Sequence, residues 1–312
     1  MAKQLSNDFT WSVSRAQAFQ NCQRAYYFNY YGSWGGWDSA APERTRQLYI
    51  LKNMKPMVMW SGSIVHDLIK QALEQYSMTR VLPSSADLQD QARLLLRQGW
   101  TDSVSQAWRA APKKTNLHEL YYGNGKTLPR EATDRIKTRV YDCLEAFVNS
   151  GTLKAILTVP FVQWKPIDIL DSFQVEEYKV WCAVDFAYTD SEGILHIVDW
   201  KTGGENPVTL RQQLACYALY AMDKWRCAVE QLALHGVFLN DGGRRSDYPV
   251  DAGLLISVKD QILLSIQAMR RKLKDPAQNL AEEEDFPLTE NLNSCESCAF
   301  REACPRFAQA GA

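Results

Sequence analysis

The sequence lacks an excess of charge of either sign, since 35 Lys and Arg residues against 36 Asp and Glu residues leave a net charge of −1. The protein therefore has no overall positive potential of the kind that indicates a nucleic-acid partner. A local basic groove is still compatible with a net charge of −1. No apolar run approaches the ~18 residues of a membrane span, and the first residues contain no apolar signal core. These absences predict a cytoplasmic protein with no membrane partner.

Cysteine is present, but its use does not suggest a disulfide framework. The chain has eight cysteines, and in a reducing compartment such a number favours metal or cluster ligation over disulfides. Three of them, Cys295, Cys298 and Cys304, have the spacing C-x2-C-x5-C in a polar tail. Thiolates at this spacing fit one metal centre, but zinc and iron–sulfur centres usually need four ligands. The fourth ligand must therefore come from elsewhere in the chain.

The segment 179–220 carries charged groups where buried strands should not have them. Asp185 lies in one apolar run, and Asp199 lies near the end of the next run, with Lys201 two residues later. Because side chains alternate along a strand, Asp199 and Lys201 should project from one face and Trp200 from the other. An acid and an amine side by side at a strand end are costly without a partner such as a metal ion or an anion. This segment is the candidate active site.

Apolar spacing predicts a helix on each of two segments that precede the candidate site. One helix covers 14–30, with Ser14 as its N-cap, and contains Cys22. The other begins near Ser63 and carries His66 in its first turn. Taken alone, Cys22 is most simply a small core residue and His66 a satisfied core or surface side chain.

The rest of the chain predicts an α/β core. Residues 84–150 are mostly polar and indicate helices of an insertion or subdomain. Gln213 and Tyr217 are four residues apart and should share one face of a helix. The expected order after the helical segment is strands, helix, strand and helix, over residues 155–200, 209–224, 231–240 and 251–274. This order implies a mixed sheet covered by helices.

Together these residues resemble the PD-(D/E)XK nuclease superfamily, and more narrowly its RecB-like branch, whose members, including the CRISPR adaptation nucleases, carry an iron–sulfur cluster. D-W-K-T-G alone is a weak motif, but its combination with the other motifs over nearly the whole chain is specific. The matching motifs are the first helix with Cys22, GSIVH ending at His66, VDF with Asp185, DWKTG with Asp199 and Lys201, QLACY with Gln213 and Tyr217, and the tail cysteines.

The resemblance implies a restriction-endonuclease-like core, with a central mixed β-sheet flanked by helices. It implies a single nuclease domain over 1–312, with a helical insertion at about 84–150. A cysteine-rich tail, about 286–312, would pair with the N-terminal helix 14–30. The chain departs from the family pattern at two positions, because Ala183 replaces a glycine before the first acid and Phe186 a basic residue after it.

The resemblance also implies a role for each candidate residue. The metal ligands would be His66, Asp185, Asp199 and the backbone carbonyl of Trp200. Hard oxygen ligands suit Mg²⁺ or Mn²⁺, and the histidine favours Mn²⁺. Lys201 would hold the attacking water or neutralise charge on the phosphorane, while Gln213 and Tyr217 would orient Lys201 or the nucleic-acid backbone.

The family pattern supplies the missing cysteine ligand as well. Cys22 would join Cys295, Cys298 and Cys304 around a [4Fe–4S] cluster. Such a cluster would act as a staple that closes a loop of nearly the whole chain. Zinc is the rival occupant of this centre.

The function implied is that of a metal-dependent deoxyribonuclease that acts on single-stranded DNA ends or flaps. The alternative is a non-catalytic DNA-binding or assembly subunit that keeps the nuclease fold. DNA repair, CRISPR adaptation and phage or antiviral defence are the pathways open to such a protein. The sequence contains no G-x-x-x-x-G-K-[ST] loop, so ATP-driven unwinding would require a helicase partner.

Overall fold

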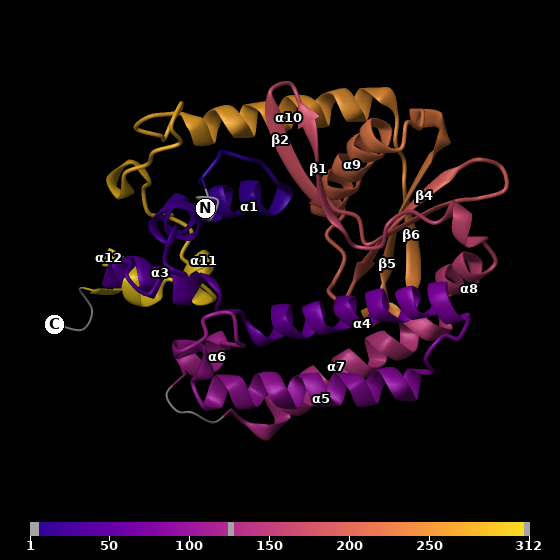
Figure 1. The fold of residues 1–312 in the computed structure, drawn as a ribbon, viewed down its shortest axis with the longest axis horizontal. Helices are drawn as coiled ribbons and strands as arrows, with labels where there is room; N and C mark the ends of the chain where they lie inside the picture. Colours follow the sequence, from indigo (N-terminus) through magenta and orange to yellow (C-terminus); the bar gives the residue numbers. More distant parts are fainter. Residues whose placement is uncertain (1–5, 124–127, 309–312) are drawn as a thin grey trace. The chain divides into compact units, whose positions relative to one another are not determined.

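A computed structural model describes residues 6–123 and 128–308, so the ends of the predicted single domain, residues 124–127 of the helical insertion and the last residues of the tail lie outside it. The chain forms two compact units, each built from separate segments (Figure 1). Unit 1 comprises Met1–Met57, Gln98–Leu128 and Ile262–Ala312, and unit 2 comprises Val58–Arg97 and Pro129–Gln261. The single nuclease domain over 1–312 stays a prediction.

Unit 2 is organised around a mixed sheet with the strand order β3-β4-β5-β6. The two central strands, β4 (Leu195–Lys201) and β5 (Leu232–Phe238), run parallel. The edge strands, β3 (Phe186–Thr189) and β6 (Arg244–Tyr248), pair antiparallel with them. The central strands are almost continuously buried, as expected for strands covered on both faces. The predicted α/β fold with a central mixed sheet is therefore confirmed.

The turn between β3 and β4 explains why these two runs form a hairpin. The Asp190 carboxylate accepts hydrogen bonds from the backbone N–H groups of Glu192 and Ile194, each at 2.9 Å. Gly193 has φ +83°, a left-handed conformation that glycine adopts without a steric penalty. The register that follows places Phe186 opposite Val198, which fixes Asp199 at the end of the paired region.

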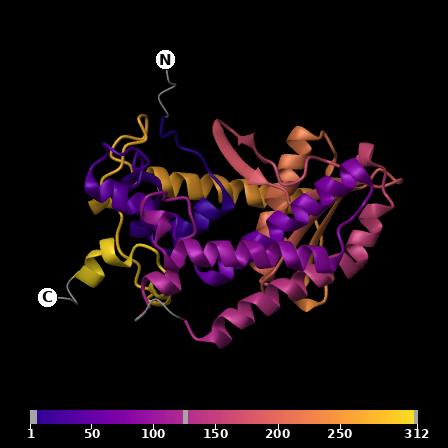
Figure 2. The ribbon, with the colours of Figure 1, turned by 60° about the horizontal axis from the view of Figure 1, so that its bottom comes forward.

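Two helices of unit 2 cover opposite faces of the sheet near the end of β4 (Figures 1 and 2). α7 (Arg130–Asn149) places Phe147 edge-on against Trp200, with ring centroids 5.3 Å apart. α9 (Pro207–Lys224) contacts β4 and β5 as well as a separate two-stranded hairpin. The hairpin strands are β1 (Leu170–Val175) and β2 (Tyr178–Ala183).

In unit 1, the predicted helix over 14–30 is wrong as a continuous element. It is divided into α1 (Val13–Asn21) and α2 (Gln23–Tyr27), followed by a π-helical turn over Phe28–Gly32. Cys22 separates the two helices because its backbone is extended, with φ −162°. Ser12 rather than Ser14 caps α1, since the Ser12 hydroxyl accepts a hydrogen bond from the Arg15 N–H at 3.1 Å.

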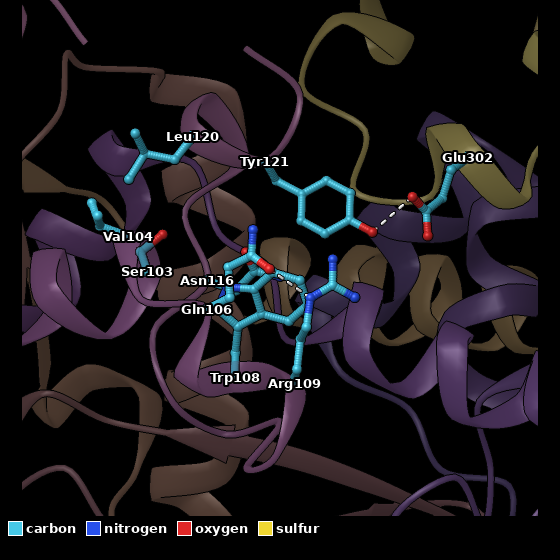
Figure 3. Close-up of a pocket in the computed structure, with 9 residues that line it drawn as sticks. All are labelled: Ser103, Val104, Gln106, Trp108, Arg109, Asn116, Leu120, Tyr121 and Glu302. Carbon is cyan, nitrogen blue, oxygen red and sulfur yellow. Dashed lines mark hydrogen bonds between the residues drawn. The ribbon is translucent and has the colours of Figure 1, made fainter. Parts of the chain in front are cut away.

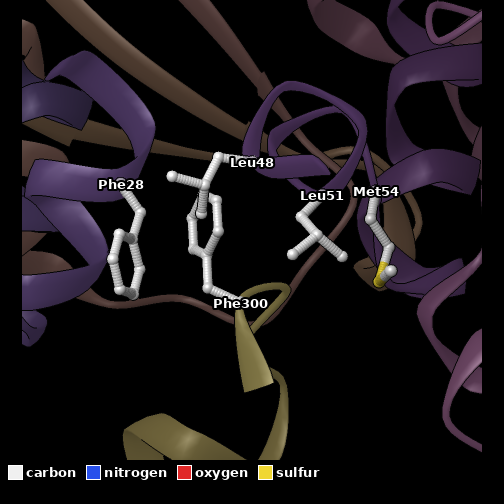
Figure 4. Close-up of a cluster of buried hydrophobic side chains, with 5 residues drawn as sticks. All are labelled: Phe28, Leu48, Leu51, Met54 and Phe300. Carbon is white, nitrogen blue, oxygen red and sulfur yellow. The ribbon is translucent and has the colours of Figure 1, made fainter. Parts of the chain in front are cut away.

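Two further features of unit 1 join segments that are distant in the sequence. A pocket is lined by residues 103–121 together with Glu302 (Figure 3). A buried apolar cluster joins the π-helical turn and α3 (Glu43–Lys52) to the tail (Figure 4). The cluster residues are Phe28, Leu48, Leu51, Met54 and Phe300. The tail is thus packed against the N-terminal segment rather than extending freely.

Helices also form in the predicted insertion, but two other predicted elements differ. No strand forms over 155–163; Ser150 instead caps a helix by accepting a hydrogen bond from Leu153 N–H at 3.0 Å. The helix with His66 begins at Met57, before Ser63. The remaining helices are α4 (Met57–Thr79), α5 (Ser85–Val104), α6 (His118–Tyr121), α8 (Gly151–Leu157), α10 (Ala252–Arg270), α11 (Asn293–Glu296) and α12 (Pro305–Ala308).

α10 alone, within the described residues, has the length and composition of a membrane-spanning helix. Its mean hydropathy is 1.2, and 28% of the relevant window is buried. Leu255, Val258 and Ile262 are buried at helical spacing, whereas Ile256 and Leu264 are exposed. Because core helices of water-soluble proteins have the same length and composition, this one helix is weak evidence for a membrane span.

Candidate active site

The predicted acid and amine meet at the end of β4 in unit 2. Asp199 is only 1% exposed, and its Oδ2 lies 2.7 Å from Nζ of Lys201. Both side chains therefore occupy one face of the strand, while Trp200 packs against Phe147 on the other face. A buried carboxylate with a cation at this distance is largely compensated, so the pair does not need a further ion in order to fold.

α9 completes the pair with the side chain of Gln213. Its Oε1 accepts a hydrogen bond from Lys201 Nζ at 2.9 Å, and its Nε2 donates to Asp199 Oδ1 at 3.0 Å. The same amide nitrogen donates to the hydroxyl oxygen of Tyr217 at 2.7 Å. Both amide protons of Gln213 are thereby used, and its orientation follows from this network. Gln213 thus fixes the acid and the amine relative to each other.

Asp185 lies beside the Asp199–Lys201 pair, but its backbone is not in a strand as predicted. It lies in a bend between β2 and β3, rather than within a strand. Its Oδ2 accepts a hydrogen bond from the backbone N–H of Trp200 at 2.8 Å, which draws it to the end of β4. His66, on α4, has its Nδ1 3.5 Å from the same Oδ2. The structure therefore brings the predicted residues of unit 2 together.

The two acids differ in their contacts, since Lys201 Nζ lies 2.7 Å from Asp199 whereas Asp185 accepts from the Trp200 N–H. Burial, and next the charge of Asp199, raise the pKa of Asp185 to about 7. Burial also raises the pKa of Tyr217 well above its usual value, so its hydroxyl stays protonated at neutral pH. The site therefore contains one carboxyl group in contact with Lys201 and a second, Asp185, whose pKa burial raises to about 7.

Two supporting contacts were not predicted from the sequence. Arg139 on α7 donates through Nη2 to the backbone carbonyl of Thr202 at 2.6 Å, and so holds the chain directly after Lys201. Gly62 on α4 lies so close to Thr202 that an added Cβ would be 3.0 Å from Oγ1. The glycine of the GSIVH motif therefore permits the close approach of α4, which carries His66.

The donor atoms suit a hard divalent cation, but they do not form a closed cage. Among residues 6–123 and 128–308, no group of three or more His, Cys, Asp or Glu side chains is arranged to hold a metal ion. Asp199 Oδ2 is buried and, although Lys201 Nζ is near, receives no aligned hydrogen bond in the described part of the chain. An oxygen with unused lone pairs beside the Asp185 carboxylate fits Mg²⁺ or Mn²⁺ in its chemistry.

The predicted cysteine ligands converge within unit 1. Cys22, Cys295, Cys298 and Cys304 line one small cavity. The Ala25 N–H donates to Sγ of Cys22 at 3.5 Å, and Arg306 Nη1 donates to Sγ of Cys295 at 3.6 Å. Burial raises the pKa of Cys298 to about 11 and also raises that of Cys304, so these thiols are neutral without a bound cation.

The thiols gather, but the described residues do not present them as a ready ligand set for a single ion. A tetrahedral zinc site requires all of its thiolates around one point. A cluster holds its thiolates farther apart, because each one binds a different iron atom. The donor set is therefore suitable in number and type, while its geometry fixes no particular occupant.

The comparisons with known proteins identify the family. The family model of the PD-(D/E)XK nuclease superfamily matches residues 10–305, and the chain belongs to this superfamily. A solved structure described as "Crystal structure of SSO0001" is similar at 14% identity, over 57% of this chain and 78% of that chain, with a TM-score of 0.27. No curated protein shows a significant match to the sequence. The members of this superfamily generally use Mg²⁺ or Mn²⁺ and act on nucleic acid.

Proposed function

We propose that this protein is a metal-dependent deoxyribonuclease of the RecB-like branch that cleaves single-stranded DNA ends or flaps. The observation that carries the proposal is the buried network of Asp199, Lys201 and Gln213 beside Asp185. A structural ion pair would not need a second carboxyl group whose pKa is raised to about 7 at its side. This arrangement suits a site that binds a cation and a phosphate together.

In this proposal each residue has one task. Asp185, Asp199, the Trp200 carbonyl and His66 would hold Mg²⁺ or Mn²⁺, which when bound polarises the scissile phosphate and lowers the pKa of water. Lys201 would turn its ammonium group toward the attacking water or the phosphate oxygens. Gln213 and the protonated Tyr217 would keep Lys201 in place.

The reaction is a hydrolysis that balances without a further reactant. The oxygen of a water molecule bonds to phosphorus, and the bond between phosphorus and one bridging oxygen breaks. One proton of the water passes to solvent, and the leaving oxygen takes up a proton. The products are a phosphate monoester and a hydroxyl group. The positive charge of Lys201 offsets the negative charge that grows on the phosphorane oxygens.

A preference for single strands is supported by exposed aromatic rings in unit 1. Trp34 is 38% exposed and Trp37 is 46% exposed, and their ring centroids lie 5.0 Å apart. Rings of this kind stack with unpaired bases in proteins that bind single strands. A helicase partner would supply unwound strands if the natural substrate begins as a duplex.

The experiment that tests the function is a cleavage panel in the presence of Mn²⁺, Mg²⁺ or a chelator. Linear and circular single-stranded DNA, duplex DNA, flaps and single-stranded RNA are compared. We expect cleavage of linear single strands and flaps with either cation and none with the chelator. Digestion of circular single strands would exclude a strict exonuclease, and preferential cleavage of RNA would contradict the proposed substrate.

We further propose that Cys22, Cys295, Cys298 and Cys304 hold a [4Fe–4S] cluster. Their convergence on one cavity and the N–H groups directed at two of the sulfur atoms support it. Iron, acid-labile sulfide and zinc are measured in protein purified without oxygen, together with the visible absorption of the cluster. A colourless protein that contains zinc and no sulfide would contradict the cluster.

The alternative, a non-catalytic DNA-binding subunit, does not require the catalytic residues of the site. A DNA-binding subunit could keep the fold without the buried acid and lysine, and nothing in their network favours such a role. The cleavage panel decides between the two functions, because a non-catalytic subunit would bind single-stranded DNA without cleaving it.

A further inference from the structure

The pocket of unit 1 contains a buried amide with no partner. Asn116 is 2% exposed, and neither its Oδ1 nor its Nδ2 has a hydrogen-bond partner in the described part of the chain. A buried amide without partners is costly, so each such group in a folded protein calls for an explanation. Asn116 lines a cavity of about 230 Å³, which leaves room for a ligand to supply the missing bonds.

The backbone around Asn116 is held firmly. Lys55 N–H donates to the carbonyl oxygen of Asn116 at 3.0 Å, and His118 N–H donates to the Lys55 carbonyl oxygen at 3.0 Å. Between them, Leu117 N–H donates to the hydroxyl oxygen of Ser103 at 3.0 Å. The backbone that carries Asn116 is therefore fixed, and binding a ligand would not require this segment to become ordered.

The walls of the pocket are aromatic and carry one guanidinium group, of Arg109, and one carboxylate, of Glu302. The rings of Trp108 and Tyr121 have centroids 5.3 Å apart, and Trp108 is 3% exposed. The Arg109 guanidinium lies over the Trp108 ring, 4.6 Å from its centroid, and Arg109 Nε donates to Gln106 Oε1 at 2.7 Å. On the other side Tyr121 donates its hydroxyl hydrogen to Glu302 Oε2 at 2.7 Å (Figure 3).

These features together select a class of ligand. An amide that offers one donor and one acceptor side by side matches the edge of a nucleobase, which presents the complementary pair. The half-buried ring of Tyr121 supplies flat surface for such a heterocycle, and the exposed Arg109 guanidinium suits the adjoining phosphate. The cavity is much larger than the ~30 Å³ share of one water molecule but smaller than the ~300 Å³ or more of a drug-sized pocket.

We propose that this pocket binds one nucleobase of single-stranded DNA, with the amide of Asn116 paired to the base edge and Arg109 directed to the strand. The proposal goes beyond hydrolysis at the acid site, since the pocket lies entirely in unit 1. It rests on the proposed function only in taking DNA as the source of the base. A free nucleotide offers the same chemistry and forms a separate arm of the test.

The test measures DNA binding directly in a protein that cannot cleave. In a full-length Lys201→Ala background, fluorescence anisotropy of a labelled single-stranded oligonucleotide is compared between the parent, Asn116→Leu and Asn116→Ala. We expect both exchanges to weaken binding roughly tenfold or more, as for a lost bidentate base contact. Because the lost amide has no protein partner, the melting temperature should stay the same or rise. Asn291→Leu, at an exposed turn, is the matched control for the exchange.

The outcomes separate the possible roles of the amide. Unchanged strand affinity and unchanged nucleotide binding in both folded variants overturn the proposal. A fall in melting temperature without a change in either affinity also overturns it and makes the amide a structural group. Deoxyadenosine monophosphate that binds directly, and does so only with Asn116 present, supports base recognition with a free nucleotide as the source. Absence of cleavage by the protein that retains Lys201 would refute the nuclease and leave these binding measurements intact.

Discussion

The two units hold their predicted ligand groups in different surroundings. In unit 2 the Asp199 carboxyl group lies 2.7 Å from Lys201 Nζ, with Gln213 bonded to both. In unit 1 the four cysteines are partly buried, and burial raises the pKa of the Cys298 thiol to about 11. The acid site is therefore complete as a folded network without a cation. The thiols must lose protons before they can bind one.

The acid site and the cysteine centre should therefore contribute differently to the stability of the fold. A network that already compensates its own charge gains function from a bound cation and little stability. Thiols that gather around a small cavity contribute little to stability until a metal centre links them across the chain. We therefore expect the loss of the divalent cation chiefly to stop catalysis, and the loss of the cysteine centre chiefly to destabilise unit 1.

The largest expected effect is the loss of cleavage when the network of unit 2 is broken. Asp199→Asn or Lys201→Met should lower the rate by roughly 10²–10³-fold or more, because transition-state charge loses its preorganised partner. Lys201→Met should also lower the free energy of unfolding by about 3 kcal/mol, because Asp199 then becomes a buried and unpaired charge. Cleavage rates and denaturant unfolding measure the two effects.

The double variant makes this prediction sharper. Asp199→Asn combined with Lys201→Met should regain most of the lost stability and none of the activity, because no unpaired charge remains. The exposed pair Asp223–Lys224, 3.9 Å apart in the same unit, is the matched control. If Asp223→Asn and Lys224→Met impair cleavage to the same degree, the site has been placed wrongly.

The second effect concerns the cysteine centre of unit 1. Cys298→Ser should abolish the visible absorption and the bound iron, and should lower the melting temperature. Limited proteolysis should then cut the tail between residues 286 and 308, which the centre no longer restrains. Cys227→Ser, at a half-buried free cysteine of unit 2, is the control. Equal melting temperatures for Cys298→Ser and Cys227→Ser would show that the thiols do not stabilise the fold through a bound centre.

The third effect is smaller, because Gln213 acts through Lys201 and Asp199. Gln213→Met should lower kcat about 10²-fold through misplacement of Lys201, with KM for DNA unchanged. The pH profile of kcat should also shift, since the environment of the acid and the amine changes. The side chain of the neighbouring Gln212 is exposed and donates a hydrogen bond to Gln261, away from the acid and the amine, so Gln212→Met is the control. A rise in KM with unchanged kcat would instead place Gln213 in substrate binding.

Much of unit 2 could be predicted because its signals are local. Continuous apolar runs with a turn between them predict β3 and β4, and alternation places Asp199 beside Lys201. The spacing of Gln213 and Tyr217 places both on one face of α9. Each of these inferences uses residues within one element or its neighbour, where the chain geometry leaves few alternatives.

The features that could not be predicted depend on contacts between distant segments. Asp185 leaves the strand because its carboxylate bonds to the backbone of Trp200, and an apolar sequence gives no sign of that bend. Cys22 divides a helix without a proline or glycine to mark the break. Arg139 and Asn116 belong to no motif. Only the tertiary structure shows that Arg139 bonds to the Thr202 carbonyl and that the buried Asn116 amide has no partner among the described residues.

The smallest effect is a pH dependence that distinguishes the two acids of unit 2. In the absence of divalent cations, Asp185 keeps its proton to about pH 7 in the folded chain, against an ordinary value of 3.8. Its contribution to stability is therefore fully present below pH 3.8 and is lost as the pH rises through about 7. Asp185→Asn mimics the protonated group and should remove this dependence.

The measurement is the difference in melting temperature between the parent and Asp185→Asn, taken without divalent cations at about pH 5 and about pH 8. Other titrating groups are common to both proteins and cancel in the difference. The stability advantage of Asp185→Asn should be larger at the higher pH than at the lower pH, where the parent has lost only part of the Asp185 contribution. Saturating Mn²⁺ should then stabilise the parent more at the higher pH, because the cation no longer competes with a proton. A difference that is the same at both pH values would mean that Asp185 is as well compensated as Asp199, and the contrast between the two acids would fail.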